Sequence, residues 1–415
     1  MSSRQPSVLM VAANWWPLAA RLAIALLQNG CRVSAVCPVG HFLTYVSGID
    51  QVHHYARIFS LASLRRALIE TTPDVIVPCD DGVVTQLHVL HRHEPSLRDL
   101  IERSLGPSQS YPIVSSRHGL LSTAMELGIR VPRTCRVERA EDLVTWHRDV
   151  ATVGILKVDG ESGGKGVRIS PSLDESLAAW QELRVGCGSA AAWKRLEIDR
   201  DPLALWMSKN QAEREVAVQA FITGRPANSM LACRGGEVLA MVSVAVVASD
   251  SPTGAATIIR RIKNDQMTNA AELLARRLQL TGFYGLDFMI ESGTETPFLI
   301  EMNPRCTQLG HLEWTDQCSL AGIFSTALRG EPRPQPLHPI RAETIVLFPQ
   351  ARAAAATYSA YIEKSYHDVP WDEPRLVREL TLAPWPQRRW LARLYHTLRP
   401  MPRSEPTIFE SLGPT

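Results

Sequence analysis

Short apolar runs alternate with helical patterns along the N-terminal part of the chain. Val8–Ala12, Val33–Cys37 and Asp74–Pro78 have the length and composition of buried strands. Between them, Leu18–Gln28 and Leu61–Glu70 repeat apolar residues with the period of an α-helix. Strands and helices at this spacing predict βαβ units and a parallel sheet.

The turn after the first predicted strand indicates what this sheet does not bind. Ala13–Pro17 reads Ala-Asn-Trp-Trp-Pro, so bulky residues stand where dinucleotide-binding turns carry glycines. The sequence therefore favours a supporting α/β domain, and a dehydrogenase built on this sheet is the disfavoured alternative.

Further along the chain the pattern changes to antiparallel strands joined by polar turns. Gly154–Val158 is a predicted strand, and the glycine-rich turn Asp159–Gly166 follows it. Val216–Ile222 and Val238–Val247 are further predicted strands. Residues 184–212 show no regular period, so we expect an irregular insertion there.

Two strand-like runs, Gly285–Ile290 and Phe298–Asn303, flank a polar turn and predict a β-hairpin. When the hairpin is folded about Thr294, Asp287 lies directly opposite Glu301. Residues that oppose each other across two strands project from the same face of the sheet. The sequence therefore predicts two neighbouring carboxylates on one face.

The face shared by Asp287 and Glu301 also carries Asn303, because side chains alternate with period two along a strand. Opposed carboxylates repel each other unless a cation lies between them, and hard oxygen ligands suit Mg²⁺, with Mn²⁺ as the alternative. Arg305 continues the same face, where it would contact a phosphate or a carboxylate. The pattern leaves one alternative open, a hairpin whose acids simply face solvent.

Lys157 lies near the end of an apolar strand, which is an unusual position for an unpaired charge. A phosphate partner would explain it. The following turn contains Gly163, Gly164 and Gly166, whose backbone N–H groups suit phosphate oxygens. It is not a Walker A loop, because a glycine and not Ser or Thr follows Lys165. A glycine-rich turn without a ligand is the alternative.

Length and composition narrow the class of protein. With 415 residues the chain is long enough for two or three domains, and 45% hydrophobic and 21% charged residues are typical of globular proteins. A net charge of +2 gives no reason to expect a nucleic-acid partner. The longest apolar run, Leu239–Ala248, is too short to cross a bilayer, and the eight cysteines show neither zinc-site nor disulfide spacing. We therefore expect a cytoplasmic protein with no transmembrane segment.

Taken in order, these motifs resemble those of the ATP-grasp superfamily over roughly residues 113–330. Ile155–Lys157 with Gly163–Gly166 is similar to the lysine strand and flexible phosphate loop of that family. Gly285–Met289 with Phe298–Arg305 is similar to its metal-binding hairpin. Each half of the resemblance is moderate, but the two halves in this order form a strong signal.

The resemblance implies a role for each matching residue. Lys157 would hold the α- and β-phosphates of ATP and Arg305 would stabilise phosphoryl transfer, so these two are the candidate catalytic residues. The implied Mg²⁺ ligands are Asp287, Glu301 and Asn303. The implied nucleotide-binding residues are Arg117, Lys157, Gly163, Gly164 and Gly166, together with the hinge residues Gln219, Ala220, Phe221 and Ile222.

Two residues depart from the pattern of the family. Arg117 stands where the family usually has a lysine, and Gln219 stands where it often has a glutamate. An arginine still binds phosphate, but as a planar fork and not as a point charge. These departures leave open whether the chain turns ATP over or only binds it.

The implied fold is α/β and α+β, with a Rossmann-like pre-ATP-grasp domain over residues 1–112 followed by a two-lobed ATP-grasp domain over residues 113–330. The small lobe would cover about residues 113–220 and the large lobe about residues 221–330. Residues 331–415 are expected to form a mostly helical C-terminal extension.

The implied activity is that of an ATP-dependent ligase. A substrate carboxylate would become an acyl phosphate and then couple to an amine or another nucleophile, with release of ADP and phosphate. The expected partners are small-molecule carboxylate and amine substrates, and a homodimer is left open. Two alternatives stand beside this reading: a nucleotide-binding regulatory or scaffold protein without turnover, and a bicarbonate-phosphorylating enzyme resembling carbamoyl phosphate synthetase.

The pocket for the second substrate is less well defined by the sequence. One set of candidates is the basic run Arg260, Arg261 and Lys263, for which a solvated basic edge is the preferred interpretation. The other set is His311 and Glu313, which follow the metal-binding hairpin.

Overall fold

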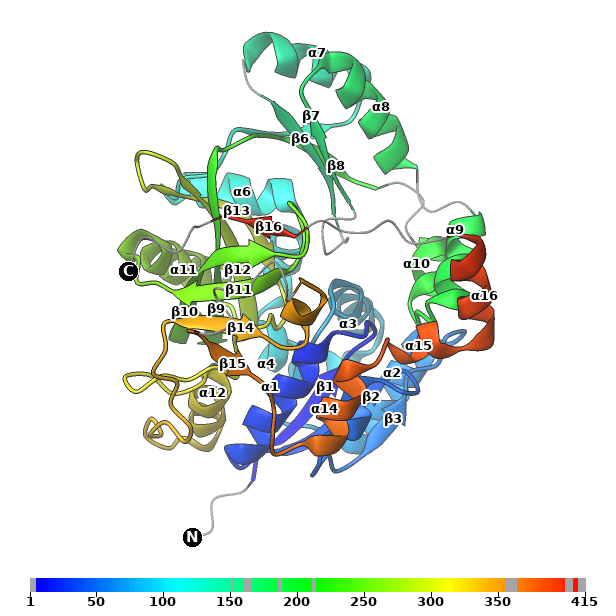
Figure 1. Cartoon of the computed structure of the whole chain (residues 1–415), viewed down its shortest axis with the longest axis vertical. Helices are drawn as coiled ribbons and strands as arrows, with labels where there is room; N and C mark the ends of the chain where they lie inside the picture. The colour runs from blue at the N-terminus through cyan, green and yellow to red at the C-terminus, as the bar shows by residue number, and fades with distance from the viewer. Residues whose placement is uncertain are drawn as a thin grey trace.

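The computed structural model describes residues 5–150, 153–159, 166–185, 189–210, 214–354, 364–399 and 406–409. Its strands form three sheets of four, eight and four strands. In Figure 1 the smaller antiparallel sheet and its helices lie at one end of the molecule, and the N-terminal parallel sheet lies towards the other. The large sheet lies between them in this view.

The N-terminal sheet is parallel, with the strand order β3-β2-β1-β4, which confirms the predicted βαβ units. Its strands are β1 (Ser7–Val11), β2 (Arg32–Cys37), β3 (Val52–His54) and β4 (Val75–Pro78). Its helices are α1 (Pro17–Gln28), α2 (Ser60–Thr71), α3 (Asp81–His93) and α4 (Arg98–Leu105). Helix α1 begins with Pro17 at its first position, where a missing N–H costs nothing.

The smaller antiparallel sheet has the strand order β5-β8-β6-β7. Its strands are β5 (Thr134–Val137), β6 (Gly154–Val158), β7 (Val167–Ser170) and β8 (Val216–Ala220). Helices α7 (Ala140–Asp149) and α8 (Leu173–Arg184) cover one face. Two helices precede this sheet in the chain, α5 (Tyr111–Val114) and α6 (Arg117–Glu126).

The expectation of an irregular insertion over residues 184–212 was wrong for its described part. Helix α9 (Ser189–Trp193), the π-helical turn Lys194–Ile198 and helix α10 (Ala204–Asn210) occupy it. Leu203 and Met207 pack into the apolar cluster of the N-terminal sheet. The segment therefore attaches to the N-terminal sheet, although it lies between two strands of the small sheet in sequence.

The large sheet has the strand order β13-β12-β9-β10-β11-β14-β15, and β16 pairs with β10. Its strands are β9 (Gly224–Arg234), β10 (Glu237–Ser249), β11 (Ala256–Arg261), β12 (Gly282–Glu291), β13 (Pro297–Asn303), β14 (Thr344–Leu347), β15 (Tyr366–Asp368) and β16 (Thr407–Ile408). Its helices are α11 (Asp265–Leu278) and α12 (Leu320–Arg329).

In the described residues of 331–415, helices cover more residues than strands, and β14, β15 and β16 complete the large sheet. Its helices are α14 (Pro374–Thr381), α15 (Trp385–Arg388) and α16 (Trp390–Leu398). This part of the chain therefore shares the sheet that carries the hairpin.

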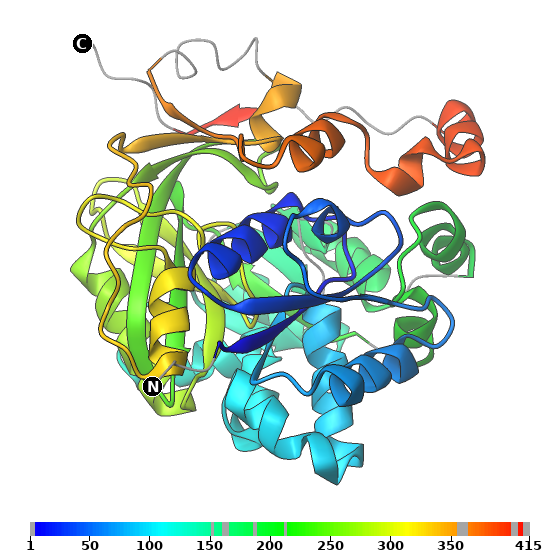
Figure 2. The ribbon, with the colours of Figure 1, turned by 90° about the horizontal axis from the view of Figure 1, so that it is seen from below.

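One apolar cluster joins the N-terminal sheet to the large sheet. It contains Met10 and Leu22 from the former and Met230, Val244 and Phe324 from the latter, all of them buried. Figure 2 shows the N-terminal strands and α1 lying against the large sheet. Because this junction is a continuous core, side chains from both sheets hold fixed positions relative to each other.

No helix within the described ranges has both the length and the apolar character needed to cross a membrane.

Candidate active site

The hairpin β12–β13 has the register that the sequence predicts. Asp287 pairs with Glu301 and Gly285 pairs with Asn303. A β-bulge follows, so that Phe288 pairs with Leu299 and the register shifts by one residue towards the turn. The bulge leaves the chemically important end of the hairpin in the predicted alignment.

The Asp287 carboxylate is held by amide groups from two neighbouring strands. Asn228 Nδ2 donates to Asp287 Oδ1 over 2.5 Å, and Asn303 Nδ2 donates to Asp287 Oδ2 over 3.0 Å. Burial and the facing Glu301 carboxylate raise the pKa of Asp287 to about 6. A divalent cation would relieve this repulsion, because it favours both carboxylates in their charged form.

Arg305 connects the hairpin to the N-terminal sheet. Its Nη2 donates to Asn303 Oδ1 over 3.2 Å, and its Nε donates to Asp81 Oδ2 over 3.0 Å. Asp81 is the first residue of α3, directly beyond the carboxyl end of β4. The guanidinium is thus fixed at the level of the predicted metal ligands, with further N–H donors left for a ligand.

Lys157 is buried, with 6% of its surface exposed. Its Nζ donates to Gln219 Oε1 over 2.8 Å. Ile155, two residues before Lys157 on β6, pairs with Gln219 on β8. Because side chains two apart on a strand share a face, Lys157 and Gln219 project from the same face of the sheet. Burial, together with the nearby Arg117, lowers the pKa of Lys157 to about 8. An anionic ligand beside Lys157 would reverse this shift.

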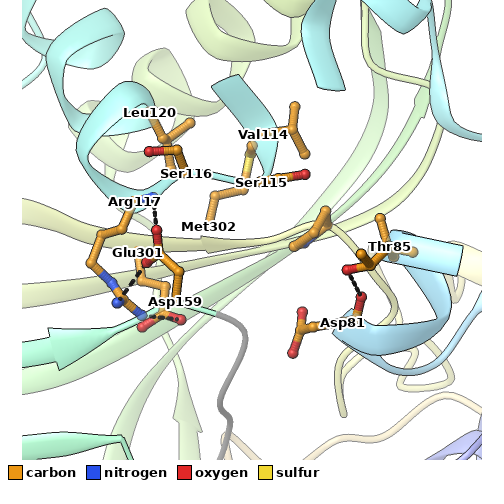
Figure 3. A pocket seen from close by; sticks show the side chains of 12 residues that line it. Asp81, Thr85, Val114, Ser115, Ser116, Arg117, Leu120, Asp159, Glu301 and Met302 are labelled. Atoms are coloured by element: carbon orange, nitrogen blue, oxygen red, sulfur yellow. Dashed lines mark hydrogen bonds and ion pairs between the residues drawn. The ribbon is translucent and has the colours of Figure 1, made fainter. Parts of the chain in front are cut away.

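Arg117 begins α6 and is buried among acids, as Figure 3 shows. Its Nη1 lies 3.0 Å from Asp159 Oδ1 and its Nη2 lies 2.9 Å from Glu301 Oε1. Burial opposes the ionisation of Glu301, but Arg117 and Lys157 hold the pKa of that carboxyl below its usual range. Arg117 therefore supplies the positive charge next to one of the predicted metal ligands.

A cavity of about 500 Å³ contains most of the predicted site residues. This volume lies within the usual range for small-molecule sites, about 300–1,000 Å³. Those that line it are Arg117, Lys157, Gly166, Phe221, Ile222, Asp287, Glu301, Asn303 and Arg305. Gln219 and Ala220 are not among the lining residues, although Gln219 contacts Lys157. Gly163 and Gly164 lie outside the described residues.

Sequence reasoning missed Asn228, Asp81 and Asp159 as site residues. Asn228 faces Asp287 across β9 and β12, two strands that are not adjacent in sequence. The one available signal was the pair Asp80 and Asp81 directly after β4, because the carboxyl ends of parallel strands are common ligand positions.

The candidates for a second-substrate pocket have other partners. Arg261 lies over the Trp314 ring, 4.7 Å from its centroid, and pairs with Asp316. His311 Nε2 lies 2.8 Å from Asp368 Oδ2, and Glu313 accepts a hydrogen bond from the His338 N–H over 2.5 Å. Neither these two residues nor Arg260, Arg261 and Lys263 line the cavity.

Arg261 is therefore predicted to support the fold and not the ligand. Arg261→Ala should lower the free energy of unfolding by about 1–2 kcal/mol, because it removes a stacked cation and a forked ion pair. Its affinity for ATP, measured by calorimetry, should equal that of the wild type. Lys263→Ala is the control, since that side chain is 82% exposed and should cost little. A weaker ATP affinity in Arg261→Ala would contradict this assignment and show that Arg261 contributes to ligand binding.

The turn after β1 is held by buried polar groups. Asp80 accepts hydrogen bonds from the Ala13 and Asn14 N–H groups and from Asn14 Nδ2. His41 is fully buried; its Nδ1 accepts the Leu43 N–H, and its Nε2 lies 2.8 Å from the Asn14 carbonyl oxygen. This arrangement fits a neutral imidazole with the proton on Nε2.

We expect this imidazole to make the protein acid-sensitive. Burial lowers the pKa of His41 from 6.5 to about 4, although the Asn14 carbonyl works in the opposite direction. This contribution to the free energy of unfolding is therefore fully present above pH 6.5 and is lost as the pH falls towards 4, about 3 kcal/mol in all. Urea unfolding of wild type and His41→Asn across this range measures it. Parallel pH slopes for the two proteins would refute the assignment.

Comparisons with known proteins agree with this geometry. The sequence model of the family described as "ATP-grasp domain" matches residues 184–308. Phosphoribosylamine–glycine ligase of Rhizobium meliloti (strain 1021) is 27% identical over 141 residues, which are 34% of this chain and 28% of that protein. The match therefore spans little more than a quarter of the length of this curated relative.

Solved structures extend the likeness over most of the chain. N5-carboxyaminoimidazole synthetase of Staphylococcus aureus, complexed with ADP, has a TM-score of 0.60 at 14% identity and covers 92% of this chain and 99% of that one. The corresponding synthase of Aspergillus clavatus, in complex with ADP and 5-aminoimidazole ribonucleotide, has a TM-score of 0.58 at 14% identity, covering 81% and 80%. The fold is thus an ATP-grasp fold of mixed α/β character, preceded by an N-terminal domain. The family model and the solved structures agree on an ATP-grasp domain, the former over residues 184–308 and the latter as a similarity of fold.

Proposed function

We propose that this protein is an ATP-dependent ligase that activates a carboxylate as an acyl phosphate and couples it to an amine. The observation that carries the proposal is that Lys157, Arg305 and the predicted metal ligands line one cavity. Cations and hard oxygen ligands in one cavity supply what phosphoryl transfer requires, namely positioning and charge neutralisation.

Mg²⁺ fits the residues present. Asp287 and Glu301 oppose each other, and Asn303 adds an amide oxygen on the same face. These are hard oxygen donors, and burial together with the facing Glu301 carboxylate raises the pKa of Asp287, a shift that a bound cation would offset. When bound, the metal would neutralise charge on the phosphate oxygens. Among the described residues, no three His, Cys, Asp or Glu side chains lie close enough together to hold a metal ion. Phosphate oxygens and water would therefore complete the coordination.

Each remaining residue has a proposed task. Lys157 binds phosphate oxygens, for which burial with a lowered pKa prepares it. The hinge after β8, with Phe221 and Ile222, borders the adenine. Arg305 orients the carboxylate and the γ-phosphate, while Asp81 holds the guanidinium in place. The sequence assigns water exclusion, which protects an acyl phosphate from hydrolysis, to the glycine-rich turn, of which Gly166 borders the cavity.

The domain assignment is proposed with the activity. Residues 1–112 would support the acceptor side of the cavity, and residues 113–330 would bind the nucleotide between a small lobe and a large lobe. The residues after 330 would complete the large lobe, in keeping with the pairing of β14 with β11.

The ligase proposal is tested by ADP release from ATP and Mg²⁺ with a panel of carboxylate and amine pairs. We expect ADP release that requires Mg²⁺ and a carboxylate and that rises further when an amine is added. If no pair in the panel releases ADP faster than protein and ATP alone, the ligase proposal is wrong.

A regulatory ATP-binding protein is the second candidate. The observation that favours it is the 2.9 Å ion pair between Arg117 and Glu301, which places a protein cation next to a predicted metal ligand. Calorimetry decides between the two: ATP binding with no turnover for any carboxylate supports the regulatory function. Bicarbonate belongs in the same carboxylate panel, because it is the substrate of the third alternative.

A further inference from the structure

The cavity that holds the proposed phosphate and metal site is also bordered by residues of the N-terminal domain and of the loop after Arg305. This part of the cavity, here called the acceptor pocket, is bordered by Trp16 and Leu18 at the start of α1 and by Val246 and Phe409 from the large sheet. The loop after Arg305 borders it with Cys306, Thr307, Gln308 and Leu309.

Charge is distributed unevenly along the cavity. The charged residues that line it are Arg117, Lys157, Asp287, Glu301 and Arg305, all of them members of the proposed phosphate and metal site. The described residues of the acceptor pocket are uncharged. Cys79 also borders the cavity, and a hydrogen bond with Cys306 together with burial holds the pKa of the Cys79 thiol well above its usual range, so this thiol stays neutral.

Gln308 provides a polar contact in this apolar pocket. Its Oε1 is buried and accepts no hydrogen bond from the described residues. Buried polar atoms are almost always hydrogen-bonded in native proteins, so an unpaired acceptor bordering a cavity marks the place of a ligand donor. The donor required is an N–H or O–H group of a ligand in the cavity that Gln308 and Arg305 both border.

We propose that the acceptor pocket binds a hydrophobic carboxylic acid with a hydrogen-bond donor near its carboxylate, the simplest being a hydrophobic α-amino acid. The inference rests on the proposed ligase activity. The carboxylate faces Arg305, the amino group donates to Gln308 Oε1, and the side chain lies between Trp16 and Phe409. The chemical step transfers the γ-phosphoryl group of ATP to a carboxylate oxygen and releases ADP.

This substrate differs in class from those named for the similar proteins. Phosphoribosylamine and 5-aminoimidazole ribonucleotide each carry a phosphate group. A phosphate is recognised by arginine, lysine or a helix N-terminus with free N–H groups. The described wall of the acceptor pocket contains no cation beyond Arg305, which serves the reacting carboxylate. The start of α1, at Trp16 and Leu18, is the helix N-terminus that borders it, so a phosphorylated acid is the competing substrate that the test must include.

Trapping with hydroxylamine tests the inference without knowledge of the natural amine. The full chain is incubated with ATP, Mg²⁺ and hydroxylamine, which displaces phosphate from an acyl phosphate and leaves a hydroxamate. We expect L-leucine and L-phenylalanine to react at least tenfold faster than L-glutamate or O-phospho-L-serine. A preference for the charged acids, or equal rates, overturns the inference and leaves the ligase proposal standing. No hydroxamate from any acid overturns both.

Gln308→Leu tests the polar contact. We expect a roughly tenfold higher KM for L-leucine and an unchanged KM for ATP, since a single hydrogen bond is removed at the acceptor end only. Its thermal midpoint should equal or exceed that of the wild type, because the unpaired oxygen is gone. Gln51→Leu, at an exposed position, is the matched control. An unchanged KM for leucine would exclude Gln308 from the pocket.

Discussion

Glu301→Gln is expected to lower Mg²⁺-dependent ADP formation by about 10²–10³-fold, an effect typical of removing one group that stabilises charge in a transition state. Glu301 is one of the two carboxylates on the proposed metal face, and glutamine offers a neutral oxygen in its place. The same change should weaken the dependence of ATP affinity on Mg²⁺. Steady-state kinetics over a Mg²⁺ titration and calorimetry with and without the metal measure the two effects.

The variant is expected to stay folded. The glutamine oxygen still accepts from Arg117, whose second partner, Asp159, is untouched. The lost ion pair is partly offset because Asp287 no longer faces a second carboxylate, so we expect a cost of about 1–3 kcal/mol in the free energy of unfolding. Glu295→Gln is the matched control in the same hairpin, on an exposed turn. Full activity in Glu301→Gln would remove Glu301 from the catalytic machinery.

Lys157→Met is expected to weaken ATP binding by about 10–100-fold, which corresponds to losing one or two hydrogen bonds to a charged group. The side chain is buried, so no other described lysine takes its position. Stability should change by no more than about 1 kcal/mol, because the lost bond to Gln219 is offset by removing a desolvated ammonium. Calorimetry with ATP and with ADP measures the binding.

A matched lysine distinguishes this local effect from a change in total charge. Lys263→Met removes one positive charge from an exposed position outside the cavity, and its ATP affinity should equal that of the wild type. Two further results would contradict the assignment of Lys157: unchanged affinity in Lys157→Met, or equal losses in both variants.

The hairpin was predictable because its register depends on nearby residues. Alternation along two strands and one polar turn fixes which side chains oppose each other. The pairing of Asp287 with Glu301 follows from that information and is confirmed. Only the bulge after Asp287 was not anticipated, since one extra residue in a strand leaves no clear mark in the pattern.

The partners of the hairpin were not predictable in the same way. The contact between Arg305 and Asp81 joins residues 224 positions apart, and the contact between Asn228 and Asp287 depends on the neighbouring of β9 and β12. Periodicity reports which face of an element is apolar, but not which distant element covers it. The strands β14, β15 and β16 escaped notice for another reason: at four, three and two residues they are too short to show a period.

The short strand β16 has a practical consequence for anyone who produces this protein. It is attached to β10 by two residue pairs and by the hydrogen bond from the Phe409 N–H to the Val247 carbonyl oxygen. Thr407 lies far from the proposed metal ligands in sequence, so a truncation that removes the chain from Thr407 onwards would look harmless. It would remove Phe409 from the cavity wall, so kinetic constants should be measured on a protein that keeps this segment.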